Sequence, residues 1–598
     1  MARHTPPRLL QELEARSPEK HSHHSFAQVQ QANMESPERK FDDLQHHEIT
    51  PQLAHTQGEE IQLATRGDLN TAADKTGLDI VDVVLNRVAE DDIMAVSRNS
   101  LQMNRRAVLR LAGILFVMGM NQAGYGIDWA VIGNINSFPT WHNYFGFGNT
   151  GAVLGTLNAL MSIGGFCGAP FLVLSDNYGR RSVNFLGNFL VIIAALLQSQ
   201  APNIACFMIG RFILGFGTSL CTSSQYMAEI SPLHLRGRLV GIFGACFQIG
   251  SVLMSGVMVA FARWTTSNWQ WRLPLLLQGL PAVLVCIFIY FLCPETPRYL
   301  VMKGRHDEAR KVIAQVMTTH NDINSPIVPL VMRQIEESLE VATTGKKTLR
   351  SSWDFRVFFT RRVAFRTAVL VFYSLFQSWN GGGIIGTYIS PALDTVGITA
   401  PLSQTGINLG LTAIYFVFTA VGAFLIDITR RRTLIFAGLI SCILTQTAVT
   451  ITSWQFTKTG STATAGLTVF WVFLYQVLSA MFIATMHNLY PVEILSLPLR
   501  AKGMALYSLI QSIAGVVQTY GISVGIGKVG YKIWVVYIVY NSLQLIVVYF
   551  LFPETSKLSL EDIDYIFETP KENPVKLSLR LEAARNQREK DAASAQQQ

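Results

Sequence analysis

Apolar runs separated by short polar stretches fill most of the chain. Runs of roughly 20 residues are long enough to cross a hydrocarbon core of about 30 Å, and six of them occupy 108–134, 152–175, 183–200, 203–223, 239–261 and 273–293. After a polar insert they resume at 364–389, 406–426, 433–454, 466–490, 503–525 and 532–552. The pattern predicts twelve transmembrane helices, six on each side of the insert.

The composition agrees with a membrane protein. Only 15% of the 598 residues are charged and 49% are hydrophobic, whereas soluble chains carry about 25% charged residues. The net charge of +8 is scattered between the apolar runs, which excludes a nucleic-acid-binding face. The seven cysteines lie in apolar stretches and predict buried thiols. No catalytic constellation, phosphate-binding loop or metal-ligand spacing is present, so we expect neither an enzyme nor a cofactor.

The basic residues of the short loops predict the orientation, because such residues accumulate on the cytoplasmic side. An even number of spans puts both tails and the insert on one face, and that face carries Arg180, Arg181, Arg236, Arg238, Arg430, Arg431, Arg432, Arg500 and Lys502. We therefore expect a multi-pass plasma-membrane protein with both termini in the cytoplasm.

This topology divides the chain into five segments. The N-terminal segment is too polar to form a core and is predicted to be disordered. The insert has helical stretches near 307–318 and 331–342. The expected segments are a cytoplasmic tail (1–105), a six-helix bundle (106–293), cytoplasmic linker helices (294–362), a second six-helix bundle (363–553) and a cytoplasmic C-terminal tail (554–598).

Three motifs of the first half recur in the second, roughly 250 to 265 residues later. They are Asp176-x-x-Gly179-Arg180-Arg181 with Asp427-x-x-Arg430-Arg431-Arg432, Glu229 seven residues before Arg236 with Glu493 seven before Arg500, and Pro294-Glu295-Thr296 with Pro553-Glu554-Thr555. Such a repeat implies two six-helix bundles related by a pseudo-two-fold axis, with a substrate site between them at the midplane.

These residues resemble the sugar porter family of the major facilitator superfamily over about 105–567. Further matching motifs are Arg211-x-x-x-Gly215-x-Gly217, Tyr226-x-x-Glu229-Ile230-x-Pro232, Trp271-Arg272-x-Pro274-x-x-x-Gln278 and Pro294-Glu295-Thr296-Pro297-Arg298. The resemblance implies an all-α membrane protein with twelve helices in two bundles and cytoplasmic linker helices. It also implies a monomeric secondary transporter in the lipid bilayer, whose partners are a sugar or polyol and protons.

The charged motifs form a predicted cytoplasmic gate. A salt-bridge set at this position would latch the two bundles, and the resemblance implies that the latch holds in the outward-facing state and breaks in the inward-facing one. A solvated boundary charge is the alternative for each member. The gate comprises Asp176, Arg180, Arg181, Glu229, Arg236, Glu295, Asp427, Arg431, Glu493 and Arg500.

Asp128 is an ionisable residue inside the first span, and such a residue is a functional candidate by default. Counting from the outer ends of their helices places Asp128 and Arg211 at a common depth of about 10 to 12 Å. An arginine stabilises the ionised carboxylate only while the two are close. We expect the pair to couple transport to protons, as the resemblance implies for an acid at this position; a static buried ion pair is the alternative.

Amide and aromatic side chains of the later spans predict the substrate pocket, because sugars need groups that donate and accept. The candidates are Gln248, Gln377, Asn380, Tyr388, Asn488 and Gln511. Positions where the family carries larger polar groups are Gly244 and Gly383 here, which would widen the pocket. Gly381-Gly382-Gly383 would break the seventh span. Interhelical hydrogen bonds are the alternative for each candidate.

The leading hypothesis is proton-coupled uptake of a hexose, a disaccharide or a related polyol by alternating access. Two alternatives remain open. The departures from the family's pocket and the long N-terminal tail favour a non-transporting sugar sensor, and a carrier of a non-sugar such as quinate would use the same fold.

Overall fold

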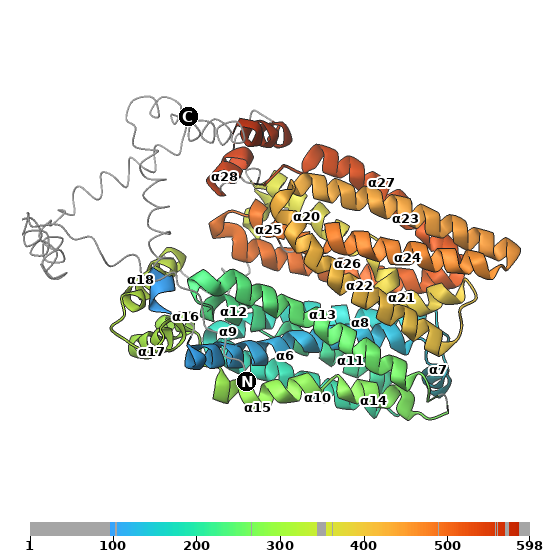
Figure 1. Ribbon diagram of the computed structural model, residues 1–598, viewed down its shortest axis with the longest axis horizontal. Coiled ribbons are helices and arrows are strands. Elements are labelled where there is room, and N and C mark those ends of the chain that lie inside the picture. The colour runs from blue at the N-terminus through green and yellow to red at the C-terminus, as the bar shows by residue number, and fades with distance from the viewer. Residues whose placement is uncertain are drawn as a thin grey trace, which may run out of the picture. The chain divides into compact units, whose positions relative to one another are not determined.

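The computed structural model describes residues 96–101, 104–264, 266–343, 355–360, 363–487, 489–556, 558, 560–568 and 573–584. Two compact units divide at Asp91. Residues 1–95 of the predicted tail (1–105) lie outside the described residues. Residues 96–100 are helical, and Ser97 and Leu101 are buried, so the prediction of disorder is wrong for this last part of the tail. The second unit, Asp92–Gln598, contains all the elements described below (Figure 1).

The described chain is helical and its long helices fall into two halves of six spans each. In the first half the spans are α6 (Arg105–Ile135), α8 (Ala152–Gly168) continued by η1 (Ala169–Val173) and α9 (Leu174–Tyr178), α10 (Arg180–Ser199), α11 (Ile204–Ser219) continued by α12 (Ser223–Ile230), α13 (Arg236–Phe261), and α14 (Trp269–Leu277) continued by α15 (Leu280–Leu292). In the second half they are α20 (Ala364–Trp379) with α21 (Gly382–Asp394), α22 (Pro401–Ile428), α23 (Arg431–Thr459), α24 (Thr462–Phe482), α26 (Leu497–Val529) and α27 (Ile533–Leu551).

Ten segments of the described chain are long and apolar enough to cross a membrane as continuous helices. Two features reconcile this number with twelve spans. One segment, Lys502–Leu551, contains both α26 and α27, and the seventh span is split into α20 and α21, each of which is too short by itself. The predicted all-α architecture with two six-helix halves is therefore confirmed.

The break in the seventh span occurs at the predicted glycines. Gly381 has φ +103°, a left-handed conformation that residues with a Cβ rarely adopt. The side chain of Asn380 accepts a hydrogen bond from the backbone N–H of Gly382 at 2.8 Å and so caps α21. The Asn380 carbonyl accepts from Gln446 at 2.7 Å and Asn541 at 3.2 Å. These side chains satisfy the backbone groups that the break frees.

The insert packs beneath the first half. It contains α16 (Pro297–Met302), α17 (His306–Met317) and α18 (Ile327–Thr343). Buried side chains such as Ile313 of α17 and Val328 of α18 share a hydrophobic cluster with Leu111 of α6. Because α17 and α18 are amphipathic, one face of each is buried here and the other stays polar.

The two halves contact one another through α8 and α26, α6 and α21, and α13 and α22. Asn136 after α6 donates to the Thr387 carbonyl at 3.0 Å, and Ser523 of α26 donates to the Gly151 carbonyl at 2.8 Å. These residues lie at the ends of their helices opposite to the charged motifs. We call the two ends the motif end and the opposite end.

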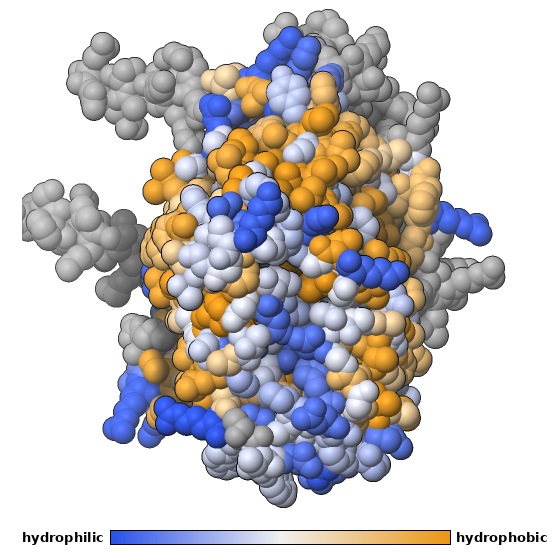
Figure 2. All heavy atoms as spheres, turned by 90° about the vertical axis from the view of Figure 1, so that its right-hand side faces the viewer, coloured by the Kyte–Doolittle hydropathy of each residue, from blue (hydrophilic) through white to orange (hydrophobic). Residues whose placement is uncertain are grey.

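Side chains of both halves form a continuous surface at the opposite end, where hydrophilic residues gather in the centre and lower part of the view (Figure 2). The short helix α7 (Pro139–Phe145), which the sequence did not predict, belongs to this end. Its Trp141 is fully buried against Phe207 of α11. Buried aromatic packing thus covers the opposite end of the first half.

We expect Gly381→Ala to lower the free energy of unfolding by about 1 to 3 kcal/mol, because the added Cβ strains a left-handed residue. Gly406→Ala, at an open position within α22, is the control and should be neutral or stabilising. Thermal unfolding of the purified proteins in detergent measures both. Equal unfolding temperatures for the two variants would contradict this account of the break.

Candidate functional site

A buried ion pair lies within the first half. Asp128 of α6 accepts a hydrogen bond through Oδ1 from Nη1 of Arg211 on α11 at 3.1 Å. The two residues are only 3% and 2% exposed. Moving two charges out of water is costly, and each buried charge depends on the other for stabilisation. Removing either side chain would therefore leave a buried charge without compensation.

Small residues position this pair. A Cβ on Gly126 would collide with the backbone carbonyl of Phe247, and one on Gly250 would collide with that of Ala123. Glycines at these two points let α6 and α13 approach closely, as small residues commonly do between membrane helices. The Gly126-Ile127-Asp128 sequence therefore fixes the α6–α13 packing as well as the carboxylate two residues later.

All three repeated motifs meet at the motif end of the first half. Arg180 forms ion pairs with Asp176 at 3.0 Å and with Glu229 at 3.1 Å. Glu295 accepts hydrogen bonds from the backbone N–H groups of Arg180 at 3.1 Å and Arg181 at 3.3 Å. The Pro-Glu-Thr carboxylate therefore caps the N-terminus of α10, where unpaired N–H groups favour an anion.

Burial raises the pKa of the Glu295 carboxyl, although hydrogen bonds from the backbone N–H groups of Thr296 and the two arginines oppose the shift.

Arg181 contacts the protein differently from Arg180. Its guanidinium donates to the Cys293 carbonyl at 3.3 Å and lies over the Tyr290 ring. Arg181 thus joins α10 to the end of α15.

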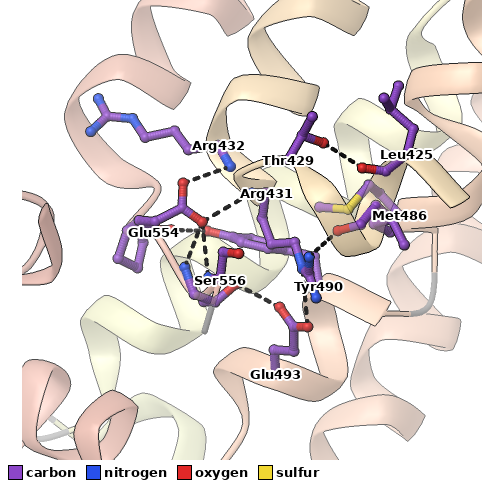
Figure 3. Close-up of polar contacts among 12 residues, drawn as sticks. Leu425, Thr429, Arg431, Arg432, Met486, Tyr490, Glu493, Glu554 and Ser556 are labelled. Atoms are coloured by element: carbon purple, nitrogen blue, oxygen red, sulfur yellow. Dashed lines mark hydrogen bonds and ion pairs between the residues drawn. The ribbon is translucent and has the colours of Figure 1, made fainter. Parts of the chain in front are cut away.

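The second half repeats this arrangement. Glu554 accepts from the backbone N–H groups of Arg431 at 3.0 Å and Arg432 at 3.1 Å, so it caps α23 (Figure 3). Arg431 also pairs with Glu493 of α25 (Leu489–Ile494) at 3.3 Å. Thr555 donates to the second oxygen of Glu493 at 2.5 Å. The sequence repeat is therefore a repeat of helix caps and ion pairs.

The ion pairs described at the motif end each join elements of the same half. Arg236 is exposed and Arg500 is half-buried, and the structure assigns neither an ion pair among the described side chains. The side chain of Asp427 lies outside the described residues. In this conformation the predicted gate residues thus stabilise the individual halves, and no described pair among them connects one half to the other.

The candidate pocket residues have different environments. Gln377 of α20 donates to the Tyr373 hydroxyl at 2.8 Å, and Gln511 of α26 donates to the Tyr507 hydroxyl at 2.8 Å. The ring of His487 lies 3.3 Å from the Gln377 amide oxygen. These half-exposed amides with adjacent tyrosines form a polar cluster in the second half. Tyr373 and Tyr507 were not predicted, although each lies one turn before its glutamine.

Three other candidates are engaged elsewhere or lie apart. Asn380 is the cap at the helix break. Tyr388 is fully buried, donates to the Thr519 carbonyl at 2.7 Å and accepts from Asn158 of α8 at 2.9 Å, so it joins the two halves. Gln248 is half-exposed on α13. Asn488 lies outside the described residues.

The two glycines expected to widen the pocket differ. A Cβ on Gly244 would meet nothing within 4 Å, so this position is open. A Cβ on Gly383 would collide with the amide nitrogen of Gln518 on α26. Gln518 therefore occupies the space beside Gly383, and its spacing of seven residues from Gln511 could have identified it from the sequence.

Comparison with known proteins identifies the family. The model of the family described as "Sugar (and other) transporter" matches residues 114–567. The chain belongs to this family. It is a multi-pass membrane transporter rather than an enzyme, as predicted from the sequence.

Two relatives of this chain come from fungi. The MFS-type transporter oryC of Aspergillus oryzae is 28% identical over 456 residues, which cover 74% of this chain and 83% of the relative. Sugar transporter STL1 of Saccharomyces cerevisiae is 26% identical over 423 residues, covering 69% and 72%.

The fold matches solved structures as well. The inward-open xylose transporter XylE of E. coli superposes with a TM-score of 0.63 at 19% identity, covering 76% of this chain and 99% of that chain. This likeness confirms the major facilitator fold.

One helical segment lies beyond the family match. Residues 574–584 are helical, and Ser578 accepts a hydrogen bond from the backbone N–H of Glu554 at 3.0 Å. Glu582 pairs with Arg430 at 2.6 Å. The segment therefore covers the capping carboxylate of the second half.

We expect Glu554→Ala to destabilise the protein by about 1 to 3 kcal/mol or more, because the buried N–H groups of Arg431 and Arg432 would lose their acceptor. Glu308→Ala removes an exposed partner of Arg305 and should cost at most about 1 kcal/mol. Thermal unfolding in detergent compares them. A Glu554→Ala protein as stable as Glu308→Ala would show that the carboxylate does not act as the cap.

Proposed function

We propose that this transporter takes up a sugar or related polyol together with protons, by alternating access of a site between its two halves. The observation that carries the proposal is the ion pair of Asp128 with Arg211 in the interior of the first half. Intramembrane ionisable residues mark ion and proton pathways more often than they serve packing alone.

The chemistry of proton coupling follows from the pair. While Arg211 contacts Asp128, the guanidinium favours the ionised carboxylate. If rearrangement of the helices separates them, the buried carboxylate lacks a counter-charge and takes up a proton. XylE of E. coli, which shares the fold, is a proton:xylose symporter, and this supports the same coupling here.

A sugar substrate is supported by the amide cluster of the second half. Gln377 and Gln511 are half-exposed, and each amide retains groups able to donate and accept. Gln248 on α13 would complete a set drawn from both halves. The relative STL1 is named a sugar transporter, which favours a substrate of this class.

In the proposed orientation the chain lies in the plasma membrane as a monomer, and its motif end faces the cytoplasm. Arginines dominate the short loops at this end. Since the halves are hydrogen-bonded at the opposite end and the described motif-end ion pairs stay within each half, we assign the conformation to the state that opens inward. Closing the motif end would bring the two charged sets together.

A non-sugar substrate such as quinate is the second candidate. The position of Gln518 beside Gly383 favours a compact substrate of this size over a disaccharide, because the amide fills space that would otherwise extend the pocket. Uptake of radiolabelled glucose, xylose, lactose, myo-inositol and quinate in a transporter-deficient yeast distinguishes the two. A change in gene expression without flux of any of them would instead indicate a sensor.

We expect Asp128→Asn to abolish uphill accumulation while preserving exchange of substrate across the membrane, because asparagine resembles the permanently protonated acid. Asp564→Asn is the control, since it removes a carboxylate from the Arg366 pair outside the first half. Accumulation and counterflow in proteoliposomes with an imposed pH gradient measure both properties. Undiminished pH-driven accumulation in Asp128→Asn would refute the coupling role.

We expect Gln377→Ala to weaken substrate binding by about 1 to 3 kcal/mol, because a bound hydroxyl would lose its partner. Gln455→Ala alters an exposed glutamine of α23 and should leave affinity unchanged. Competition binding with the substrate found in the uptake panel gives the two dissociation constants. Equal constants would remove Gln377 from the site.

A further inference from the structure

The first half contains a small cavity beside Asp128, lined by both apolar and polar residues. Its volume is about 20 Å³, and its walls come from α6, α10, α11 and the α14–α15 junction. A cavity of this kind needs roughly 10 to 15 Å³ to hold one water molecule. The cavity lies inside the first half, apart from the amide cluster of the second half.

Two of the residues that line this cavity carry buried polar atoms without partners among the described residues. Asp128 uses Oδ1 for Arg211, while its buried Oδ2 has no hydrogen-bond partner among the described residues. Gln278, which lines the cavity and is 2% exposed, has no partner for either its amide nitrogen or its amide oxygen within the described chain. Buried polar groups are nearly always paired, and ordered water commonly supplies the partner. Three unpaired atoms around one cavity match the two to four contacts that a buried water makes.

A series of asparagines leads from the cavity towards the motif end. Asn121 and Asn188 line the cavity, and both donate to the side-chain oxygen of Asn184, at 2.6 Å and 2.8 Å. Asn184 lies one helical turn from Arg180 on α10. Ser223 donates to the Asn121 side chain at 3.4 Å. Polar groups therefore continue from Asp128 to the ion pairs of Arg180 through the interior of the first half.

We propose that this cavity binds water and relays the proton between Asp128 and the motif end inside the first half, separately from the path of the sugar. The inference rests on the proposed proton coupling. In the release step the O–H bond of protonated Asp128 breaks and the proton bonds to the cavity water to form hydronium, which transfers a proton to further water molecules along the asparagine side chains and so to water at the motif end. The carboxylate that remains is neutralised by Arg211. Gln278 acts as a positioning residue that holds the water against Oδ2.

Few other titratable groups face Asp128. Arg211 of α11 contacts it directly, and Tyr125 of α6 and Cys221 after α11 line the cavity. Neither Tyr125 nor Cys221 normally ionises at neutral pH. The lining residues from α10 and from the α14–α15 junction are not titratable, and α13 approaches α6 there through Phe247 and Ser251. Asp128 is therefore the group whose protonation the cavity water would serve.

Time-resolved infrared spectroscopy of the purified full-length protein tests the route without a substrate. The carboxyl band of Asp128, identified by its loss in Asp128→Asn, is followed after a pH jump. Gln278→Met keeps the side-chain length but removes the hydrogen-bonding groups, and we expect it to slow proton exchange of Asp128 by at least about tenfold. Gln278→Asn, which keeps an amide group at this position and adds no second carboxyl band, should retain a rate near that of the wild type.

Gln198→Met is the matched control. Gln198 is a fully buried glutamine of α10 whose amide atoms also lack partners among the described residues, yet it does not line the cavity. We expect it to leave the exchange rate unchanged. If Gln278→Met does not fold, as judged by gel filtration, Asn188→Leu replaces it with the same expectation.

The outcomes separate the two proposals. A titrating Asp128 band that relaxes equally fast in Gln278→Met, Gln198→Met and the wild type overturns the route and leaves the coupling intact. A band that does not titrate at all overturns the coupling, and the route with it. Slowing in Gln278→Met alone supports both.

Discussion

The bilayer offers no hydrogen-bond partner to a polar group, so polar groups inside this protein depend on other parts of the chain or on buried water for their partners. Asp128 and Arg211 satisfy one another across α6 and α11. The split seventh span obeys the same rule, since Gln446 and Asn541 bind the Asn380 carbonyl that the break leaves open. At this break, dedicated side chains make up for the lost backbone contacts.

The repeated motifs express this constraint at the helix ends. Glu295 and Glu554 each bind the first N–H groups of the helix that follows the basic loop, α10 in one half and α23 in the other. The remaining chemistry is divided unequally. The first half holds the buried ion pair and a small cavity, whereas the second half holds the amide and tyrosine cluster around Gln377. In the proposed mechanism the proton is therefore handled in the first half, and the substrate is bound mainly by the second half, with Gln248 completing the set from the first.

Several features were predictable because they depend on local sequence. The spans follow from apolar length, and the break at Gly381 follows from three consecutive glycines. The depths of Asp128 and Arg211 follow from the rise of a helix. Prediction was weaker where a side chain could turn to different neighbours: Tyr388 joins the two halves at Asn158, and Gln518 fills the space beside Gly383. The short helix α7 was not predicted, because its seven residues are far fewer than a membrane-spanning run needs.

The sequence by itself thus determined the membrane class, the twelve spans, the internal repeat and the family, because apolar length and motif spacing are properties of the chain's order. Only the tertiary structure decided which partner each polar side chain takes. It made Asn380 a helix cap, kept the described gate ion pairs within their own halves and brought Gln278 and Asp128 to one cavity. These outcomes depend on helix rotation and on contacts between residues far apart in the chain, which periodicity does not specify.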